Sequence, residues 1–440
     1  MASPLSPWLK RLLLGVLLLL LVLPALQAKF RFVAVRPLGG YEAPLTPPEF
    51  SREGLLDNTY QPAIEHYTEG HLGFREWLIR LRNQWCFSLL GKITEPTIGM
   101  GRNQQLYQFA AINAYLGRDF LGDEEIAFRV RRLRRLQDTL RAHGTQLLVV
   151  LAPGKARILP EFLPESYAQV LPTHPSNHDV LARRLPEAGV AVLDASQLLL
   201  RWKDTVRYPL FPRTGTHWSG YAVSLLADTL FRRAEVMTGH DLPDFRRHGG
   251  TVSRHIEELR FTDNDLGNIL NLAHDIEPMP LYYPKVEFGP AQSKHRLDAL
   301  IIGDSFAQSF YGFYPYYDRL LASRSRFWSY NLYTYWPEKT PESRVIHELN
   351  LREQYAGRDI VIILGTEQNL PQMGFGFLDD AFDLYIPRTA KDSLRTKELE
   401  QQILATPSWM DQVAQKAASK NIDILQAVHD DAQYMSDRER

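Results

Sequence analysis

A serine and a histidine stand in two short segments that suit a nucleophile and its base. Ser305 lies in the segment GDSF (303–306), directly after the apolar run ALIIG. His217 lies in the segment FPRTGTHWSGYA (211–222). A serine becomes a nucleophile when a base lies within hydrogen-bond reach. Together the segments predict that Ser305 attacks a substrate carbonyl and that His217 takes its proton.

The residues before Ser305 are expected to shape the turn that exposes it. Gly303 permits a tight backbone, and the first amides of a following helix can donate to a developing oxyanion. Asp304 is expected to brace this turn rather than to act on the histidine, because adjacent side chains at a turn point apart. An alternative interpretation is that Ser305 only caps the helix and that His217 only packs beside Trp218.

Other chemistry-bearing motifs are incomplete. Gly154 precedes a lysine, but Val149 stands where a phosphate loop needs its first glycine. Gln104 replaces the third glycine of a dinucleotide fingerprint, and Leu351 replaces the second histidine of a zincin motif. The single cysteine, Cys86, excludes an intramolecular disulfide and any multi-cysteine zinc site. We therefore predict neither a metal nor a cofactor.

The elements that position Ser305 and His217 are predicted from five short apolar runs. These runs occupy residues 146–153, 190–196, 299–306, 326–331 and 359–367. Such runs, alternating with helical stretches, are typical of a parallel sheet covered on both faces. The predicted fold class is α/β, with three layers (α/β/α) and a central, mostly parallel sheet. Chemistry in such folds sits beyond the carboxyl ends of the strands, which is where Ser305 falls.

The first 28 residues are predicted to be a membrane anchor. An uncharged, mostly apolar run extends from Leu12 to Ala28, about the shortest length that spans a bilayer as a helix. A cleaved signal peptide is the alternative, since Ala28 suits the last position before a cut. Leu26 does not suit the position two residues earlier, which favours an uncleaved anchor with the body outside the cytoplasm.

The rest of the chain divides by composition. Residues 29–69, rich in proline and glycine, are predicted to be an extended stalk. Residues 70–380 are predicted to be the α/β domain, and residues 381–440 a C-terminal helical extension that packs on it. Within 74–90, large apolar residues recur at helical spacing, and Cys86 beside them is interpreted as a small core residue. The stripe comprises Trp77, Leu78, Leu81, Trp85 and Leu89.

The charge balance argues against nucleic acid as a partner. The chain has 440 residues, with 50 Lys plus Arg against 51 Asp plus Glu, so the formal charge is −1. No global basic field is available to gather phosphates.

GDSF together with THWS (216–219) resembles the SGNH-hydrolase-like domain of the alginate O-acetyltransferase family, the AlgJ and AlgX type. Further segments resemble that family: IGMGRNQQLYQF (98–109), LLVVLAPGKARILPEFLP (147–164), and the tail that begins at FGFLDDAF. The resemblance covers roughly residues 70 to 435.

The resemblance implies an acyl transfer in the bacterial envelope, with the chain anchored in the inner membrane. Ser305 would carry the acetyl group and His217 would be its base, and a hydroxyl of an exopolysaccharide or cell-wall glycan would receive the group. A membrane-bound O-acyltransferase would be the donor partner. The alternatives are a carbohydrate acetylesterase of the same fold and a catalytically impaired glycan-binding subunit.

The chain departs from the family at the acid that orients the histidine. The family pattern is Asp-x-His-Trp, whereas Gly215 occupies the aspartate position here. Loss of this acid can be severe, because it fixes the tautomer and supports the charged imidazole. Asp263, Asp265 and Glu367 are candidate substitutes, and Asp265 is the choice among them.

Aromatic residues are frequent after Ser305, and they are predicted to line a sugar groove, with a packed aromatic core as the alternative. The residues proposed for the groove are Tyr311, Tyr314, Tyr330 and Trp336.

Overall fold

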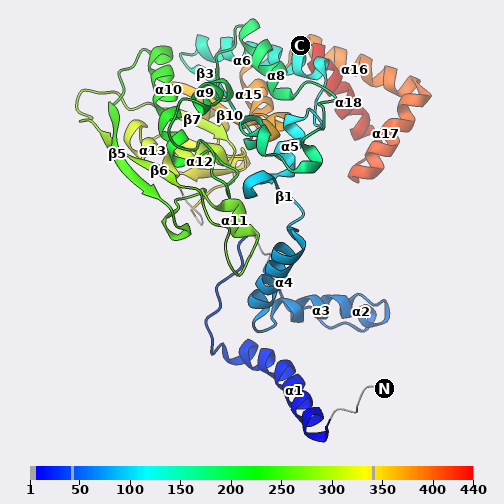
Figure 1. Ribbon diagram of the computed structural model, residues 1–440. Helices are drawn as coiled ribbons and strands as arrows, with labels where there is room; N and C mark the ends of the chain where they lie inside the picture. The colour runs from blue at the N-terminus through cyan, green and yellow to red at the C-terminus, as the bar shows by residue number, and fades with distance from the viewer. Residues whose placement is uncertain (1–5, 41–43, 339–341, 440) are drawn as a thin grey trace.

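A six-stranded sheet forms the centre of the body in the computed structural model, which describes residues 6–40, 44–338 and 342–439 (Figure 1). The strand order is β4-β3-β10-β7-β8-β9, parallel except for β9, which pairs antiparallel with β8. The α/β prediction is confirmed, and each predicted apolar run contains a strand. The strands are β3 (Gln146–Ala152), β4 (Val192–Asp194), β7 (Ala299–Gly303), β8 (Arg326–Ser329), β9 (Tyr333–Trp336) and β10 (Ile360–Thr366).

Side chains alternate along the central strands and enter two separate cores. Leu148 and Val150 of β3 face one core, while Leu147 and Val149 face the other. Since successive side chains of a strand point to opposite faces, this continuous apolar pattern requires helices on both sides. The first core is covered by α9 (Ala195–Lys203), α10 (Gly220–Thr238), α12 (Ser305–Gly312) and α13 (Tyr316–Leu320), and the second by α6 (Asp123–Ala142), α8 (Asn177–Glu187), α14 (Leu351–Tyr355) and α15 (Phe377–Tyr385).

Two small antiparallel sheets flank the body and were not predicted. One consists of β1 (Ile98–Met100) and β2 (Leu106–Gln108), and the other is the arm of β5 (Phe245–Ser253) and β6 (Leu281–Phe288). Short helices lie near the carboxyl edge of the central sheet: α5 (Phe109–Tyr115), α7 (Lys155–Ile158) and α11 (Asp265–Ile269).

The C-terminal helices form a unit with its own core, seen at the upper right of Figure 1. These are α16 (Ala390–Ala405), α17 (Pro407–Lys420) and α18 (Ile424–Glu439). Leu399, Ile403, Val413 and Val428 are buried among them. Tyr434 of α18 joins the unit to α6 through a hydrogen bond of 3.0 Å to Glu125.

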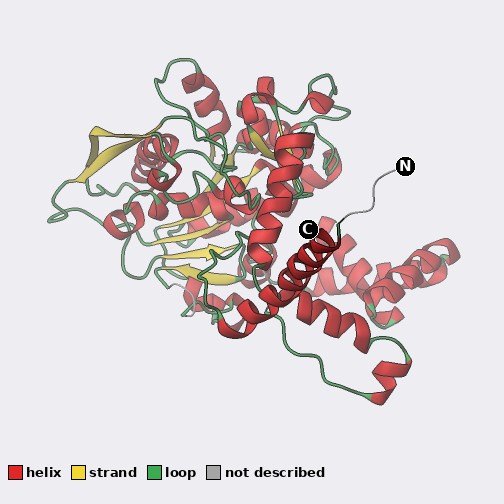
Figure 2. Cartoon of the chain, turned by 60° about the horizontal axis from the view of Figure 1, so that its bottom comes forward, coloured by secondary structure: helices red, strands yellow, loops and turns green. Residues whose placement is uncertain are grey.

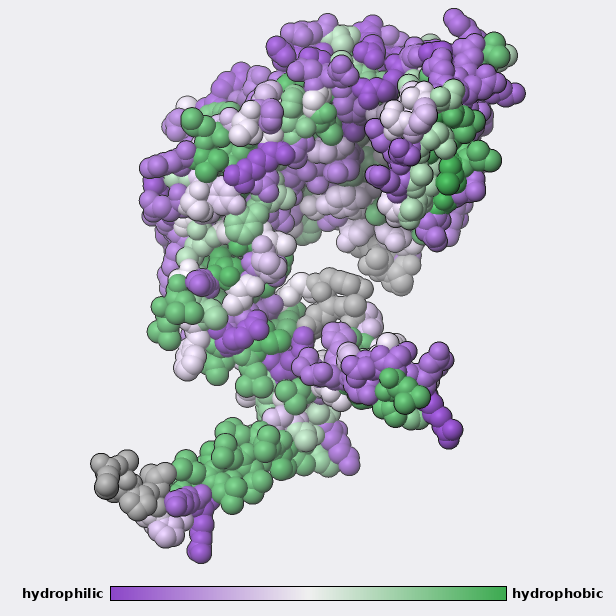
Figure 3. Space-filling model, turned by 90° about the vertical axis from the view of Figure 1, so that its right-hand side faces the viewer, coloured by the Kyte–Doolittle hydropathy of each residue, from purple (hydrophilic) through white to green (hydrophobic). Residues whose placement is uncertain are grey.

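The N-terminal helix α1 (Pro7–Phe30) lies away from the body in Figure 1, and Figure 2 turns this end of the molecule toward the viewer. Its most apolar window has a mean hydropathy of 2.3 and none of that window is buried. By length and composition it can cross a membrane, and its exposed face is apolar in Figure 3. Residues 1–5 of the predicted anchor and 41–43 of the predicted stalk lie outside the described residues.

The stalk prediction was wrong in part, because two helices interrupt residues 29–69. They are α2 (Arg52–Leu56) and α3 (Tyr60–Gly70). The side chain of Ser51 accepts a hydrogen bond of 2.9 Å from the amide of Gly54 and so caps α2. The prolines of the stalk concentrate before residue 49, which leaves the following residues free to become helical.

Helix α4 (Arg75–Leu90) was predicted correctly as a helix, but its polar face is buried and its apolar face is exposed. The apolar stripe is exposed, with Trp85 at 67% and Leu89 at 72%. The side of α4 that packs on the body instead carries Arg80 and Asn83, which are 9% and 6% exposed. Cys86 is half-buried beside the stripe, so its interpretation as a core residue was wrong.

Candidate active site

Ser305 and His217 meet at the carboxyl edge of the sheet. Ser305 is the first residue of α12 and is separated from the end of β7 by Asp304 alone, and its Oγ lies 2.7 Å from Nε2 of His217. His217 is 6% exposed and packs against Phe306, with the ring centroids 4.7 Å apart. Trp218 is fully buried beside the same phenylalanine. The imidazole is therefore held by packing within hydrogen-bond reach of the serine.

Asp265 lies on the other side of the imidazole. Its Oδ2 is 2.6 Å from Nδ1 of His217, and its Oδ1 accepts from the amides of Thr216 (2.9 Å) and Leu266 (2.8 Å). Bonds to both oxygens fix the carboxylate, and the carboxylate in turn holds the imidazole with Nε2 toward Ser305. The structure thus brings together the three residues that the sequence singled out as nucleophile, base and substitute acid.

Gly215 explains why the acid comes from a distant loop. A Cβ at this position would meet Cγ of Pro212 at 2.6 Å and the carbonyl oxygen of Thr262 at 2.9 Å. The loop that carries Asp265 therefore occupies the space beside residue 215. The amide of Gly267 also donates to the carbonyl of Thr214 at 2.9 Å, which ties the two loops together.

Lys155 supports the histidine loop from beneath. Its ammonium donates to three backbone carbonyls, those of Pro212 (2.6 Å), Arg213 (2.8 Å) and Gly215 (3.1 Å), and the residue is 1% exposed. Burial lowers the pKa of Lys155 well below its ordinary value, while the Asp265 carboxylate opposes that lowering. Since each of its three N–H groups donates to a different carbonyl, the side chain fixes the curvature of the loop.

Asp304 braces the serine turn, the role its position suggested. One carboxylate oxygen accepts from the amide of Phe306 at 3.1 Å and caps α12. The other accepts from the amide of Thr366 and from the side chain of Asn369, both at 2.8 Å. Gly303 is buried, and a Cβ there would lie 3.1 Å from a carbonyl of β10. The turn is thus clamped to the end of β10.

The other two candidate acids lie elsewhere. Asp263 is buried and accepts a hydrogen bond of 2.6 Å from the hydroxyl of Tyr283. Burial raises the pKa of Asp263 to about 8. Glu367 forms a buried ion pair with Arg157, 2.6 Å between Oε1 and Nη2, and accepts from the amide of Gly154. Neither carboxylate is engaged with His217.

Three of the four residues proposed for the sugar groove lie in the core instead. Tyr314 and Trp336 are each 6% exposed, and Tyr311 packs against the same core. The ring of Trp336 also donates to Asp318 at 3.1 Å. Tyr311 lies on α12, Tyr314 follows α12 and Trp336 ends β9, and all three rings pack in or against the first core, so this part of the groove prediction was wrong.

Tyr330 is the exception, and it lies next to Ser305. The amide of Tyr330 donates to the carbonyl of Gly303 at 2.9 Å. Burial and the Asp304 carboxylate raise the pKa of Tyr330, whereas hydrogen bonding from Ser305 opposes that rise.

A groove of about 870 Å³ begins at Tyr330 and ends at the C-terminal unit, and we call it the C-terminal groove. Its walls come from the segment after β8, the segment after β10, α6, α15 and α18. Sequence reasoning missed most of its residues, because they come from five distant segments without a motif; of the four residues proposed for a sugar groove, only Tyr330 lies in this lining. The lining includes Glu125, Phe128, Tyr330, Asn369, Phe375 and Tyr434.

Part of the chain is similar to a known family and to a curated protein. Residues 106–323 match the family model described as the SGNH hydrolase-like domain of the acetyltransferase AlgX, a span that contains Ser305, His217 and Asp265. A probable alginate O-acetylase AlgJ of Pseudomonas putida is 28% identical over 135 residues, which are 31% of this chain and 33% of the relative. The chain thus spans about a third of the length of this curated relative.

Two solved structures overlap the chain with lower similarity. The O-acetyltransferase domain of Pseudomonas putida AlgJ covers 67% of this chain and all of its own, at 19% identity and a TM-score of 0.42. Pseudomonas aeruginosa AlgX covers 64% of this chain and 66% of its own, at 15% identity and a TM-score of 0.37. By the family model and the curated relative, residues 106–323 of this chain are similar to the SGNH hydrolase-like domain of the AlgJ/AlgX type.

Proposed function

We propose that the protein is an O-acetyltransferase that moves an acetyl group through acetyl-Ser305 to a hydroxyl of an extracytoplasmic polysaccharide. One observation carries the proposal: Ser305, His217 and Asp265 form a continuous hydrogen-bonded chain with spacings of 2.7 and 2.6 Å. A glycan-binding subunit has no need of this alignment, so the geometry supports an enzyme.

The chemistry proceeds in two acyl transfers. Nε2 of His217 takes the proton of Ser305 as Oγ attacks the acetyl carbonyl of the donor, and the imidazolium then protonates the departing donor oxygen. In the second transfer, His217 takes the proton of the acceptor hydroxyl as that oxygen attacks acetyl-Ser305. The serine leaves as its alkoxide and recovers the proton from His217. Asp265 stabilises the imidazolium during both transfers.

The oxyanion of each tetrahedral intermediate faces the start of α12. Ser305 is the first residue of that helix, so its amide belongs to the unpaired amino-terminal turn. Amides of this kind, with the positive end of the helix dipole, stabilise negative charge where it develops. Asp304 holds the turn in this orientation through its contacts with the end of β10.

The C-terminal groove supplies a place for the acceptor. It starts at Tyr330 and Asn369, which contact the serine turn, and combines aromatic rings with carboxylates and amides. Rings that present a face to the apolar side of a sugar, flanked by hydrogen-bonding groups, suit a glycan chain. A bound acceptor beside Ser305 favours transfer over hydrolysis, which distinguishes the proposal from an esterase.

Helix α1 is proposed to anchor the chain in the inner membrane of a bacterial envelope, with the body outside the cytoplasm. It has 24 residues and the composition of a membrane span. A membrane-bound O-acyltransferase is proposed as the donor partner, because an anchored enzyme meets a donor in the same bilayer.

The test uses the full chain in detergent with a chromogenic acetyl ester. We expect the wild-type protein to release the chromophore and to carry an acetyl group on Ser305 by mass spectrometry, and Ser305→Ala to do neither. Added oligosaccharides should accelerate chromophore release and appear as acetylated sugars. Free acetate as the sole product would indicate an esterase, and equal rates for the wild type and Ser305→Ala would contradict catalysis at this site.

A further inference from the structure

A second cluster of chemistry-bearing side chains lies at the opposite end of the sheet. His240 follows the end of α10, His295 precedes β7, and Asp359 precedes β10. Because β7 and β10 are adjacent and parallel, the residues before them meet at the amino edge, whereas Ser305 lies at the carboxyl edge. The cluster is thus separate from the candidate active site.

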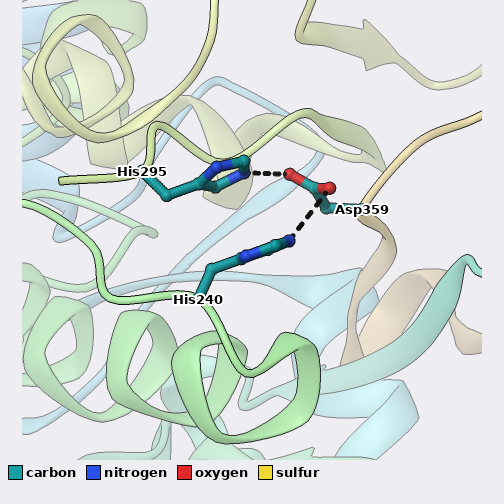
Figure 4. A group of neighbouring side chains, drawn as sticks. All are labelled: His240, His295 and Asp359. Atoms are coloured by element: carbon teal, nitrogen blue, oxygen red, sulfur yellow. Dashed lines mark hydrogen bonds and ion pairs between the residues drawn. The ribbon is translucent and has the colours of Figure 1, made fainter. Parts of the chain in front are cut away.

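Both imidazoles point toward the carboxylate of Asp359 (Figure 4). Nε2 of His295 lies 2.6 Å from Oδ2, and Nε2 of His240 lies 3.3 Å from Oδ1. The two rings stack with their centroids 3.8 Å apart, and one ligand atom from each residue lies within 4.8 Å of the other two. The amide of Asp298 donates to Oδ2 at 2.8 Å and holds the carboxylate in place.

We propose that His240, His295 and Asp359 bind one divalent transition-metal ion, with Zn²⁺ as the best match. Two imidazole nitrogens and one carboxylate oxygen are ligands that Zn²⁺ prefers, with water as the fourth. In a tetrahedral zinc site with bonds of about 2.0–2.1 Å, ligand atoms lie roughly 3.3 Å apart. The 3.3 Å between Nε2 of His240 and Oδ1 of Asp359 already has this value. Nε2 of His295 lies 2.6 Å from the other oxygen, Oδ2, so His295 must move relative to the carboxylate when the ion binds.

The surroundings leave the carboxylate available to an ion. The neighbouring basic side chains form ion pairs with other carboxylates: Lys294 pairs with Asp241 at 2.7 Å, and Arg358 pairs with Asp298 at 2.7 Å. The side chains of His240 and His295 are 38% and 40% exposed, so water can reach the open coordination position. A bound ion would join three segments that are distant in the sequence, and its role would be to stabilise the amino edge.

The test measures binding of Zn²⁺ alone to the full chain in detergent after treatment with a chelator. By calorimetry and elemental analysis we expect one ion per chain. His240→Ala and His295→Ala should each weaken binding at least about 100-fold, because even residues that only support a ligand cost 10–100-fold. His248→Ala, which removes an exposed histidine on β5, is the matched control and should bind as the wild type does. Saturating Zn²⁺ should raise the melting temperature of the wild type by about 3–6 °C.

A spectroscopic measurement separates ligand loss from misfolding. Co²⁺ in place of Zn²⁺ should give visible d–d absorption in the wild type and in His248→Ala, and none in Asp359→Asn. Hydrolysis of the chromogenic ester should persist in all of these variants, since the cluster is remote from Ser305, and it serves as the check on folding. Equal Zn²⁺ affinity in the wild type and His240→Ala, or no binding by the wild type, would overturn the proposal and leave a hydrogen-bonded cluster only.

Helix α4, which lies between the body and α1 in Figure 1, carries the basis of a second inference. Helix α4 exposes its apolar stripe although its polar face is buried. On the buried face, Arg80 donates to the carbonyls of Arg36 (2.8 Å) and Pro37 (2.6 Å), and Asn83 donates to that of Leu270 (2.9 Å). These bonds fix the orientation of the helix, so the apolar stripe cannot rotate inward.

The exposed stripe begins beside the end of α1. A Cβ on Gly73 would meet the carbonyl oxygen of Pro24 at 2.2 Å, so the loop before α4 lies directly against α1. Phe74 packs against Phe32, which follows α1, and stacks on Trp77 of the stripe. We infer that the stripe of α4 lies in the lipid headgroup region of the bilayer that α1 crosses. This inference rests on the proposed membrane anchor, and interfacial tryptophans suit that depth.

The single cysteine makes this inference testable in the full chain in liposomes. Cys86→Ser gives a cysteine-free background, in which Leu89→Cys and Val236→Cys each carry one nitroxide. Val236 is the matched control, an apolar residue of α10 that is 78% exposed. We expect the probe at residue 89 to collide with dissolved oxygen and to be shielded from a water-soluble relaxation agent, and the probe at residue 236 to do the reverse. The inference is overturned if the probe at residue 89 is exposed to the water-soluble agent, or if a protein partner shields it from both agents. Failure of the membrane anchor is a separate result, which is detected as protein that does not co-purify with the liposomes.

Discussion

At the scale of single residues, Asp265 is expected to carry the function of the missing family aspartate. Its carboxylate lies 2.6 Å from Nδ1 of His217. Asp265→Asn keeps the shape but removes the charge that supports the imidazolium and favours the wrong tautomer. We expect kcat on the chromogenic ester to fall by about 10³–10⁴-fold.

Asp263→Asn is the matched control, because the same loop carries both residues. Asp263 hydrogen-bonds to Tyr283 and not to the histidine. Its raised pKa of about 8 leaves it protonated at pH 7, and asparagine has nearly the same shape as the neutral acid. Its kcat should stay within about threefold of the wild type. A large loss in Asp263→Asn with none in Asp265→Asn would reverse the assignment.

Placing an aspartate at the family position should harm this protein. In Gly215→Asp, the new Cβ meets Pro212 and the carbonyl of Thr262, so the loop that carries Asp265 must move away from His217. We expect a loss of stability of about 1–3 kcal/mol, and a lower kcat. Thermal melts and ester kinetics measure both, with Gly289→Ala as a control, since a Cβ there has no neighbour closer than 3.4 Å. A faster Gly215→Asp enzyme would indicate that the distant acid serves poorly.

Asp263 also predicts how stability depends on pH. Burial raises its pKa from 3.8 to about 8 in the folded state. Between these values the unfolded chain has released the proton and the folded chain retains it, so raising the pH favours unfolding. This group alone lowers the free energy of unfolding by up to about 1.4 kcal/mol per pH unit, and the loss ends above the folded pKa. Denaturant titrations from pH 5 to 8 should show a flatter profile for Asp263→Asn than for the wild type; parallel profiles contradict the prediction.

Residue types in two short segments were enough to predict that Ser305 and His217 meet, because both segments feed helices at the carboxyl edge of a parallel sheet. The choice of Asp265 over Asp263 was less secure. The two residues share one loop, and only the backbone path past Gly215 decides which carboxylate faces the imidazole. The catalytic roles themselves stay predictions until Ser305 and Asp265 are replaced.

At the scale of elements, the loop that carries His217 depends on Lys155 of α7. In Lys155→Met, the carbonyls of Pro212, Arg213 and Gly215 lose a buried donor. An unsatisfied buried group costs about 1–3 kcal/mol, and partial relaxation suggests a total loss of stability of about 2–4 kcal/mol. The loop should also become more mobile, which lowers kcat more than it changes KM.

Lys203→Met is the control for removing a lysine. Lys203 forms a partly exposed ion pair with Glu161. Pairs of this kind contribute about 0–1 kcal/mol, so both stability and kcat should change little. If Lys155→Met behaved like Lys203→Met in denaturant titrations, the loop would not need its buried donor.

Elements with strong apolar patterns were predictable, and those without were not. Strands β3, β7 and β10 read as continuous β-rich runs because both faces of each are buried. The arm of β5 and β6 escaped prediction, since β5 carries charged and glycine residues and is largely exposed. In α4, spacing identified the helix but not the buried side, because burial there follows hydrogen bonds from Arg80 and Asn83 rather than hydrophobicity.

At the scale of the whole molecule, the C-terminal groove lies between the body and the C-terminal unit, and Tyr434 is the aromatic residue that α18 contributes to its lining. In Tyr434→Ala, we expect KM for an oligosaccharide acceptor to rise about 3–10-fold through loss of ring stacking. Hydrolysis of the small chromogenic ester should be unchanged, because that substrate needs only the serine turn.

Tyr434→Phe tests whether the ring itself binds the acceptor. It keeps the aromatic face but loses the hydrogen bond to Glu125. Its KM should stay nearer to that of the wild type than to that of Tyr434→Ala. Equal KM values for Tyr434→Ala and the wild type would place the acceptor outside this groove.

The position of β10 in the sheet sets the order in which the protein can be completed. This strand comes late in the chain, yet it lies between β3 and β7 and pairs with both. Before residues 360–366 arrive, β3 with β4 and β7 with β8 and β9 are two fragments that lack their common neighbour. The Asp304 clamp also needs Thr366 and Asn369. A chain that emerges amino end first therefore exposes Ser305 before Thr366 and Asn369 are available to fix the turn around it.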